Sequence, residues 1–179
     1  MKATGIVRKI DDLGRIVIPK EIRKTLHIRE GDPLEIFIEQ KGDIILRKYA
    51  PMGDMIDMSS KYIDTLSEMT EFIACITDSE TVIAISKNYK NEYLGKSISD
   101  EIIELMKERK KLSTIEDKKV PILLNEKSDK YVSQIIVPII ANTDVIGSVI
   151  LFSINKKQIT DVEIKLVESA AKFLSKQFE

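Results

Sequence analysis

The first fifty residues of this chain offer very little apolar surface for a fold to bury. Residues 5–10, 15–18, 34–39 and 44–48 are rich in β-branched side chains or alternate apolar with polar, which predicts four short strands. Residues 21–26 predict one short helix. Even domains of ~60 residues bury only about 60% of the surface that the unfolded chain exposes, so a unit this small is insecure alone. The chain has one cysteine and hence no internal disulfide, and an obligate dimer is the expected remedy.

Positive charge is concentrated at the start of the chain. From Lys2 to Lys24 there are seven basic side chains and three acidic ones. Residues 1–50 carry 11 basic and 8 acidic side chains, a net charge of +3, whereas the remainder carries 17 basic and 21 acidic ones, a net charge of −4. A basic head on an acidic body suggests that only the head meets nucleic acid.

Turn residues between the first two predicted strands bring the basic side chains toward one end of the head. Asp11 and Gly14 favour a turn, and Pro19 suits the start of a helix because its missing N–H has no intrahelical partner there. Clustered cations on such a frame are typical of phosphate binding, although a charge run by itself is more often a solvated surface. The candidate DNA-binding residues are Arg8, Lys9, Arg15, Arg23 and Lys24.

A specific pattern runs through this basic stretch: Arg8…Asp11…Gly14-Arg15…Ile18-Pro19…Arg23. Over roughly residues 3–50 it resembles the N-terminal DNA-binding domain of the AbrB family of bacterial transition-state regulators. The resemblance implies a swapped-hairpin β-barrel, in which two chains interleave their hairpins, and double-stranded DNA as the partner. It also implies that Arg8, Arg15 and Arg23 approach DNA. Lys24 stands where an arginine is common in that family. A lysine there keeps the positive charge but lacks the paired N–H donors of a guanidinium.

Proline and glycine between residues 50 and 54 mark a domain boundary, with a head of residues 1–52 and a body of residues 53–179. Apolar side chains then recur at intervals of three and four, which predicts a helix with a narrow, nearly heptad stripe. Such a stripe normally packs on its own domain, but it suits the same helix of a neighbouring chain equally well. Its members are Met55, Met58, Tyr62, Leu66 and Met69.

The rest of the body alternates strand-like and helical segments. A capping box at residues 160–163 opens a final helix, and Ser99 suits the N-cap of a middle one. Pro138 must lie at an edge or a bulge, because proline cannot donate to a strand ladder. The order predicts an α+β domain with an antiparallel sheet and flanking helices. The predicted strands are residues 72–77, 81–86, 120–124, 131–140 and 145–154, the last of them central, and the middle helix is residues 100–111.

Residues 135–140 followed by 144–150 resemble the C-terminal strands of a GAF domain, over roughly residues 56–178. That resemblance implies dimerisation or a small-molecule ligand, whose identity it does not give. Tyr89 and Tyr93 suit the lining of a ligand pocket, but loop tyrosines more often cover the edge of a core.

An AbrB-like head joined to a GAF-like body resembles a family of sporulation regulators of endospore-forming bacteria. The resemblance implies a transcription factor that acts as activator and repressor, and a homotetramer in which GAF-like domains tie head dimers together. The stripe described above and the final helix are the candidate surfaces for that assembly, although both helices suit the core of their own domain nearly as well. On the final helix the residues are Val167, Ala170, Ala171 and Leu174.

Two other classes of function have weaker support. An enzyme or redox sensor would need a reactive group, but Cys75 lies in an apolar strand, where cysteine is more often a small buried hydrophobe. No nucleophile–base pair, metal-ligand cluster or glycine-rich phosphate loop is visible, so we expect no catalysis, no cofactor and no metal. AbrB-like heads also occur in antitoxins, but those usually carry a short disordered tail rather than a folded body. Co-purification of a toxin would favour that alternative.

The N-terminus lacks an apolar signal core, and no apolar run approaches the ~20 residues of a membrane span. We therefore expect a cytoplasmic protein without a membrane partner.

Overall fold

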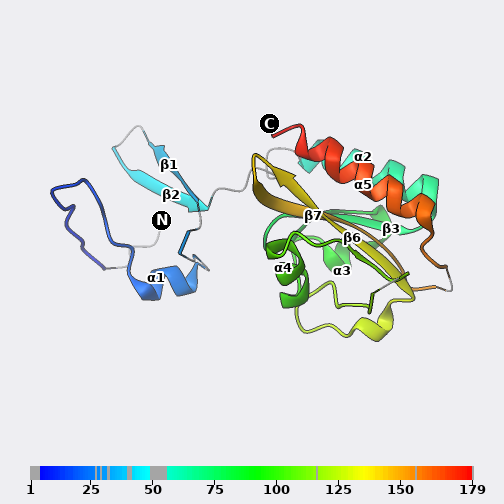
Figure 1. The fold of residues 1–179 in the computed structure, drawn as a ribbon. Helices are drawn as coiled ribbons and strands as arrows, with labels where there is room; N and C mark the ends of the chain where they lie inside the picture. The colour runs from blue at the N-terminus through cyan, green and yellow to red at the C-terminus, as the bar shows by residue number, and fades with distance from the viewer. Residues whose placement is uncertain are drawn as a thin grey trace. The chain divides into compact units, whose positions relative to one another are not determined.

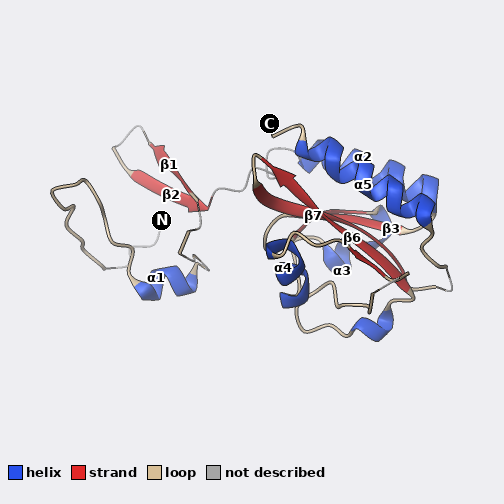
Figure 2. Cartoon of the chain, viewed as in Figure 1, coloured by secondary structure: helices blue, strands red, loops and turns tan. Residues whose placement is uncertain are grey.

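The chain divides into two units, residues Met1–Tyr49 and Ala50–Glu179, here called the head and the body. The computed structural model describes residues 5–26, 28, 30–31, 33–39, 42–48, 56–115, 117–155 and 157–178, with only the backbone described at residues 48 and 56–58. The predicted boundary after residue 52 lies outside the described residues. Figure 1 follows the chain through both units, and Figure 2 shows helices and strands in each of them.

The head contains one helix and one hairpin. Helix α1 spans Lys20–Thr25, and Pro19 is its N-cap residue rather than its first helical residue. Strands β1 (Leu34–Ile38) and β2 (Ile44–Lys48) pair antiparallel, with Ile38 opposite Ile44. This confirms the predicted helix and the second predicted hairpin.

The first two predicted strands are absent from the single chain. Residues 5–10 and 15–18 form no strand, and every residue from 5 to 17 is exposed. Their β-branched composition is suitable, but a strand also needs a neighbour to accept and donate its backbone hydrogen bonds, and sheet propensity depends on that context. The described part of the single chain contains the turn between the two segments but no strand that pairs with either one.

The body is built on a five-stranded antiparallel sheet with the order β4-β3-β7-β6-β5 (Figure 1). Strand β7 lies in the middle, as predicted, and pairs with β3 on one side and β6 on the other. Strand β5 pairs only with Ile135 and Ile136 of β6, and Pro138 lies beyond that stretch. The missing N–H of Pro138 therefore breaks no ladder. The strands are β3 (Ile73–Thr77), β4 (Val82–Ile85), β5 (Leu112–Ser113), β6 (Ser133–Ala141) and β7 (Asp144–Ser153).

Helices cover both faces of this sheet. Helices α2 (Ile56–Thr70) and α5 (Asp161–Ser175) lie side by side on one face, and α3 (Lys90–Tyr93) and α4 (Asp100–Lys107) lie on the other (Figures 1 and 2). Short 3₁₀ turns, η2 (Lys87–Tyr89) and η3 (Ser128–Lys130), complete the connections.

Both predicted helix starts are confirmed, but α4 ends four residues early. The Thr160 side chain accepts from Val162 N–H while Glu163 accepts from Thr160 N–H, which is the predicted capping box. Ser99 caps α4 by accepting from Ile102 N–H. Arg109 takes a left-handed conformation with φ of 55°, and Lys110 N–H turns back to the Leu105 carbonyl, a closure that ends the helix.

The predicted strand at residues 120–124 is wrong, because this segment forms only one isolated antiparallel bridge, between Leu123 and Ile98, and a side chain satisfies its backbone at Val120. The amide of Gln134 on β6 accepts from Val120 N–H and donates to Val120 C=O over 3.0 Å. The backbone at Val120 is thereby satisfied without a ladder. The backbone edge of β6 pairs instead with β5, where Ser113 lies opposite Ile135.

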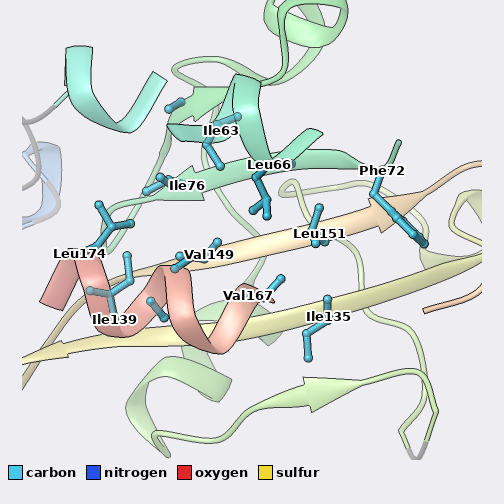
Figure 3. Close-up of a cluster of buried hydrophobic side chains, with 14 of the residues drawn as sticks. Ile63, Leu66, Phe72, Ile76, Ile135, Ile139, Val149, Leu151, Val167 and Leu174 are labelled. Atoms are coloured by element: carbon cyan, nitrogen blue, oxygen red, sulfur yellow. The ribbon is translucent and has the colours of Figure 1, made fainter. Parts of the chain in front are cut away.

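Alternating side chains of the sheet fill two apolar cores. Ala74 and Ile76 point toward α2 and α5, whereas Cys75 points toward α3 and α4. Figure 3 shows the first of these cores, between the sheet and the two long helices. Because successive side chains of a strand point to opposite faces, and because these strands are apolar along most of their length, the sheet has two buried faces.

Four residues predicted for oligomerisation belong to that first core. Leu66 of α2 and Val167, Ala170 and Leu174 of α5 are buried against the sheet (Figure 3), and Ala171 is buried with them. This corrects the assignment of these side chains to an interface between chains: a residue that closes its own domain has no surface left for a partner. Of the remaining stripe residues, Met69 is 69% exposed and Tyr62 is half-buried, whereas Met55 and the Met58 side chain lie outside the described residues.

Candidate nucleic-acid interface

A rigid turn at residues 11–15 presents the first group of cations. Asp11 N–H donates to the Arg15 carbonyl over 3.0 Å, and Gly14 N–H donates to the Asp11 carbonyl over 3.0 Å. The Asp11 carboxylate accepts from the N–H groups of Leu13 and Arg15, at 3.0 and 2.8 Å. Gly14 has a φ of +75°, which an L side chain rarely adopts. The turn predicted from Asp11 and Gly14 is confirmed.

Arg15 is tied to this turn by its side chain as well. Its Nε donates to Asp11 Oδ2 over 2.8 Å, and the Arg15 side chain remains 69% exposed. The backbone N–H of Arg15, followed by its guanidinium, holds the pKa of Asp11 below its usual value, so the carboxylate is ionised near neutral pH. Sequence reasoning missed this ion pair, although an Asp and an Arg four residues apart around a glycine turn are a usable signal.

Arg8 and Lys9 precede the turn and are both exposed. The guanidinium of Arg8 makes only a local contact, in which Nη1 donates to the Val7 carbonyl over 3.3 Å. Neither side chain forms an ion pair with a carboxylate in the part of the chain that the structure describes. Both cations are therefore available to an external anion.

Arg23 and Lys24 occupy the last turn of α1, where positive charge is favoured by the helix dipole. Arg23 is half-buried, and its Nε is buried without a hydrogen-bond partner. Lys24 is exposed. Within the described residues neither one is paired with a carboxylate.

The single chain places these cations in two groups rather than one. The extended segment 15–19 separates the turn from α1 (Figure 1), and no hydrogen bond or ion pair among the described residues joins Arg8 or Arg15 to Arg23 or Lys24. The structure thus shows each group on its own element, and their convergence on one surface stays a prediction.

An exposed apolar face lies on the head hairpin. Ile36 and Ile38 on β1 stand opposite Leu46 and Ile44 on β2, and all four are exposed, with Ile38 78% exposed. Val7, in the segment before the turn, is 85% exposed. Monomeric proteins rarely leave a contiguous apolar patch of this kind open to water. On the other face of the hairpin, the Arg47 guanidinium lies 4.8 Å from the centre of the Phe37 ring.

The body places its candidate reactive groups inside the core. Cys75 is fully buried, and burial raises the pKa of its thiol. Tyr93 is also buried, with its hydroxyl 3.3 Å from that of Tyr131, and both rings contact Phe152. Tyr93 therefore fills the core. Tyr89 is half-buried and packs at the edge of the same cluster.

Among the described residues, no helix is both long and apolar enough to cross a membrane. The same residues also contain no group of three or more His, Cys, Asp or Glu side chains arranged to hold a metal ion.

Fold and surface together define a two-domain protein with a small basic head and a GAF-like α+β body. Residues 7–54, which include most of the head, match a family model described as antidote-toxin recognition MazE, bacterial antitoxin. The chain is 61% identical over 51 residues to the transition state regulatory protein AbrB of Bacillus subtilis, covering 28% of this chain and 52% of that protein. The body is similar in fold to the GAF domain from Acinetobacter phosphoenolpyruvate-protein phosphotransferase, at 10% identity and a TM-score of 0.55, covering 68% of this chain and 80% of that one.

Residues 54–179 match the family model described as stage V sporulation protein T C-terminal, transcription factor. The whole chain is 46% identical over 179 residues to stage V sporulation protein T of Bacillus subtilis, covering 100% of this chain and 99% of that protein. The chain therefore belongs to the stage V sporulation protein T family of transcription factors. The resemblances to the AbrB family, to GAF domains and to sporulation regulators are confirmed.

Proposed function

We propose that this protein binds double-stranded DNA through its head and regulates sporulation genes as an activator or a repressor. The observation that carries the proposal is a set of cations on the head, Arg8, Lys9, Arg23 and Lys24, that have no carboxylate partner among the described residues, in a chain whose net charge is −1. Each cation that contacts a phosphate releases condensed counterions, which favours association. Such a protein acts where the chromosome lies, which in a bacterium is the cytoplasm.

Alanine substitutions test which cations contact DNA. For Arg8→Ala, Arg23→Ala and Lys24→Ala, we expect the log–log slope of affinity against salt to shrink by about 0.9 for each phosphate contact removed. An arginine that reads a base should instead cost about 1–3 kcal/mol and relax the preference at one position. Fluorescence anisotropy across a salt series separates the two cases. Lys118→Ala, which removes an exposed cation of the body, is the matched control. Unchanged affinity in Arg8→Ala and Arg15→Ala proteins that still fold would refute the proposed interface.

The head is proposed to function as an interleaved homodimer. Support comes from the exposed apolar face of the β1–β2 hairpin and from the strand-like segments 5–10 and 15–18, which have no partner strand among the residues that the structure describes. A second copy of the chain would cover the apolar face of the hairpin with its own matching face. The same copy would supply strands that pair with segments 5–10 and 15–18. Interleaving would also bring cations from two chains onto one surface.

The body is proposed to join two head dimers into a homotetramer through the outer face of α2 and α5. Several apolar side chains remain exposed there after the core residues are set aside. Tyr62 of α2 stacks on Phe173 of α5, with ring centres 5.6 Å apart. Exposed Met69 and Val162 lie on the same two helices. These side chains replace the buried ones as the candidate contact surface.

Charged substitutions on this outer face should lower the oligomeric state without unfolding the body. We expect Met69→Glu or Phe173→Glu to convert a tetramer into a folded dimer, measured by light scattering. Binding to long DNA should weaken through lost effective concentration, while binding to a short single site should change little. Ile115→Glu, at an exposed position outside these helices, is the control. The assembly proposal fails if both variants stay tetrameric or if the wild type is never more than a dimer.

We assign Cys75 no catalytic or redox role, because its thiol is buried and burial raises the pKa of that thiol. A small-molecule ligand of the GAF-like body is a further proposal, which a thermal-shift screen of the intact chain would test.

The head's match to the bacterial antitoxin model makes toxin binding the second candidate function. Co-purification of a toxin with the intact chain would favour it over gene regulation.

A further inference from the structure

Asp11 and Arg15 form a fixed pair at the tip of the head turn, and their chemistry differs from that of the other cations. We propose that Asp11 is a positioning residue for sequence recognition: it holds the Arg15 guanidinium by Nε, so that the two terminal nitrogens form a preset fork for the paired acceptors of a base edge. This proposal rests on the proposed DNA-binding function of the head.

The first step of the argument is that the carboxylate is fixed before it meets the arginine. Asp11 Oδ1 accepts from the backbone N–H groups of Leu13 and Arg15, at 3.0 and 2.8 Å. The turn itself is closed by backbone bonds between the same residues. Exposed ion pairs are usually weak, because two flexible side chains must be ordered. Here only the Arg15 side chain has to be ordered, since the turn already holds its partner.

The second step is the way in which the guanidinium is held. Only Nε of Arg15 reaches Asp11 Oδ2, at 2.8 Å. Neither terminal nitrogen has a hydrogen-bond partner within the described part of the chain. Two parallel N–H donors of this kind match two adjacent acceptors on a guanine edge in the major groove. A guanidinium already held in one orientation gives up less rotamer freedom when it binds.

The third step separates Arg15 from the other cations by charge. The Asp11–Arg15 pair carries no net charge, so it adds little to the general attraction of phosphates. A carboxylate beside the guanidinium also repels a phosphate more strongly than it repels a neutral base edge. Arg8, Lys9, Arg23 and Lys24 have no such carboxylate among the described residues and are suited to phosphates. Arg15 is therefore better suited to base readout than to charge neutralisation.

The test compares Asp11→Asn with Asp12→Asn in the full chain. Asparagine keeps an oxygen acceptor for the turn but loses the charge that holds Arg15. Asp12 is exposed and forms no hydrogen bond or ion pair with Arg15, so Asp12→Asn removes the same charge nearby. The probes are a duplex selected from a random pool by the wild-type chain, and the unselected pool. Anisotropy at one salt concentration gives the ratio of the two affinities.

Asp12→Asn should strengthen binding to both probes by the same factor, leaving the ratio unchanged. Asp11→Asn should strengthen binding to the unselected pool and weaken binding to the selected duplex, lowering the ratio by about tenfold, within the range of one bidentate base contact. In an Arg15→Ala background, Asp11→Asn should have no effect on the ratio beyond that of Asp12→Asn. Arg15→Lys leaves the carboxylate and the turn in place, and it should lower the ratio by about the same factor as Asp11→Asn.

Three results would overturn the proposal. If Asp11→Asn changes both affinities as Asp12→Asn does, Asp11 is only a nearby charge. If it lowers the ratio equally in the Arg15→Ala background, it acts through the turn rather than through Arg15. If Arg15→Lys keeps the full ratio, no fork is used, and this last result stands even if Asp11→Asn fails to fold. Failure of the underlying function looks different, because the wild-type chain would then enrich no duplex from the pool.

Discussion

Replacing Gly147 with alanine is expected to destabilise the body by about 3 kcal/mol, the upper end of the usual cost of overpacking. A Cβ at Gly147 would lie 2.0 Å from the Thr77 carbonyl oxygen, 3.1 Å from the Thr77 carbonyl carbon and 3.3 Å from the Asp78 Cα. All three are backbone atoms, so no side chain can rotate to make room. The clash lies where β3 meets central β7, and the two strands would have to separate to relieve it. Denaturant unfolding of the full chain, followed by circular dichroism, measures the loss.

Gly95→Ala is the matched control for this substitution. Gly95 has a φ of +74°, but a Cβ there would meet nothing within 4 Å. Its replacement should cost about 1–2 kcal/mol from backbone strain alone. If Gly147→Ala unfolds at the same denaturant concentration as the wild type, the close approach of β3 and β7 does not limit the side chain at position 147.

The second large effect is expected from Ile38→Asp in the head hairpin. In a lone head, Ile38 is 78% exposed, and a change to a polar residue there should alter stability by no more than about 0.5 kcal/mol. In the proposed interleaved dimer the same position would be covered, and an unpaired carboxylate would be buried at a cost of about 3 kcal/mol or more. The substitution is thus expected to be nearly neutral in a lone head and strongly destabilising in the dimer. Amide hydrogen exchange of β1 and β2 in the full chain measures local stability, and DNA affinity should fall with it.

Leu124→Asp provides the comparison, because it makes the same chemical change at an exposed position of the body. It should leave exchange in both domains close to that of the wild type. Exchange in the wild-type head should also slow as protein concentration rises, since folding and association are then one equilibrium. A head that tolerates Ile38→Asp and shows no concentration dependence would contradict the interleaved dimer.

Part of the candidate site could be predicted from the sequence, and part could not. The spacing of Asp11 and Gly14 predicted the turn, and Pro19 predicted the start of α1 to within a residue. The pairing of Asp11 with Arg15 was not predicted, because it depends on the direction in which the turn sends the Arg15 side chain. Counting charges in the sequence identifies the cations. Only the three-dimensional structure distinguishes an arginine that is paired with a carboxylate from one that is not.

Local chemistry in the sequence determined most of the body's elements. Long apolar runs predicted β6 and β7, and the more hydrophobic run placed β7 at the centre of the sheet, where both neighbours bury it. Ser99 and the Thr160–Glu163 capping box predicted two helix starts, since a cap needs only residues within one turn. Alternating burial of Ala74 and Cys75 on opposite faces follows from the same strand geometry.

Only the tertiary structure decided matters that depend on residues far apart in the chain. Residues 120–124 have strand-like composition, yet the Gln134 side chain satisfies Val120 and no ladder forms. The helical spacing of Leu66 and Met69 is equally compatible with a core or an interface, and the sheet buries Leu66 while leaving Met69 exposed. Segments 5–10 and 15–18 form no strand because a strand exists only with a neighbour, and the described residues of the single chain supply none. Periodicity predicts which side chains share one face of a helix or strand. Long-range packing determines which other element, or which other chain, covers that face.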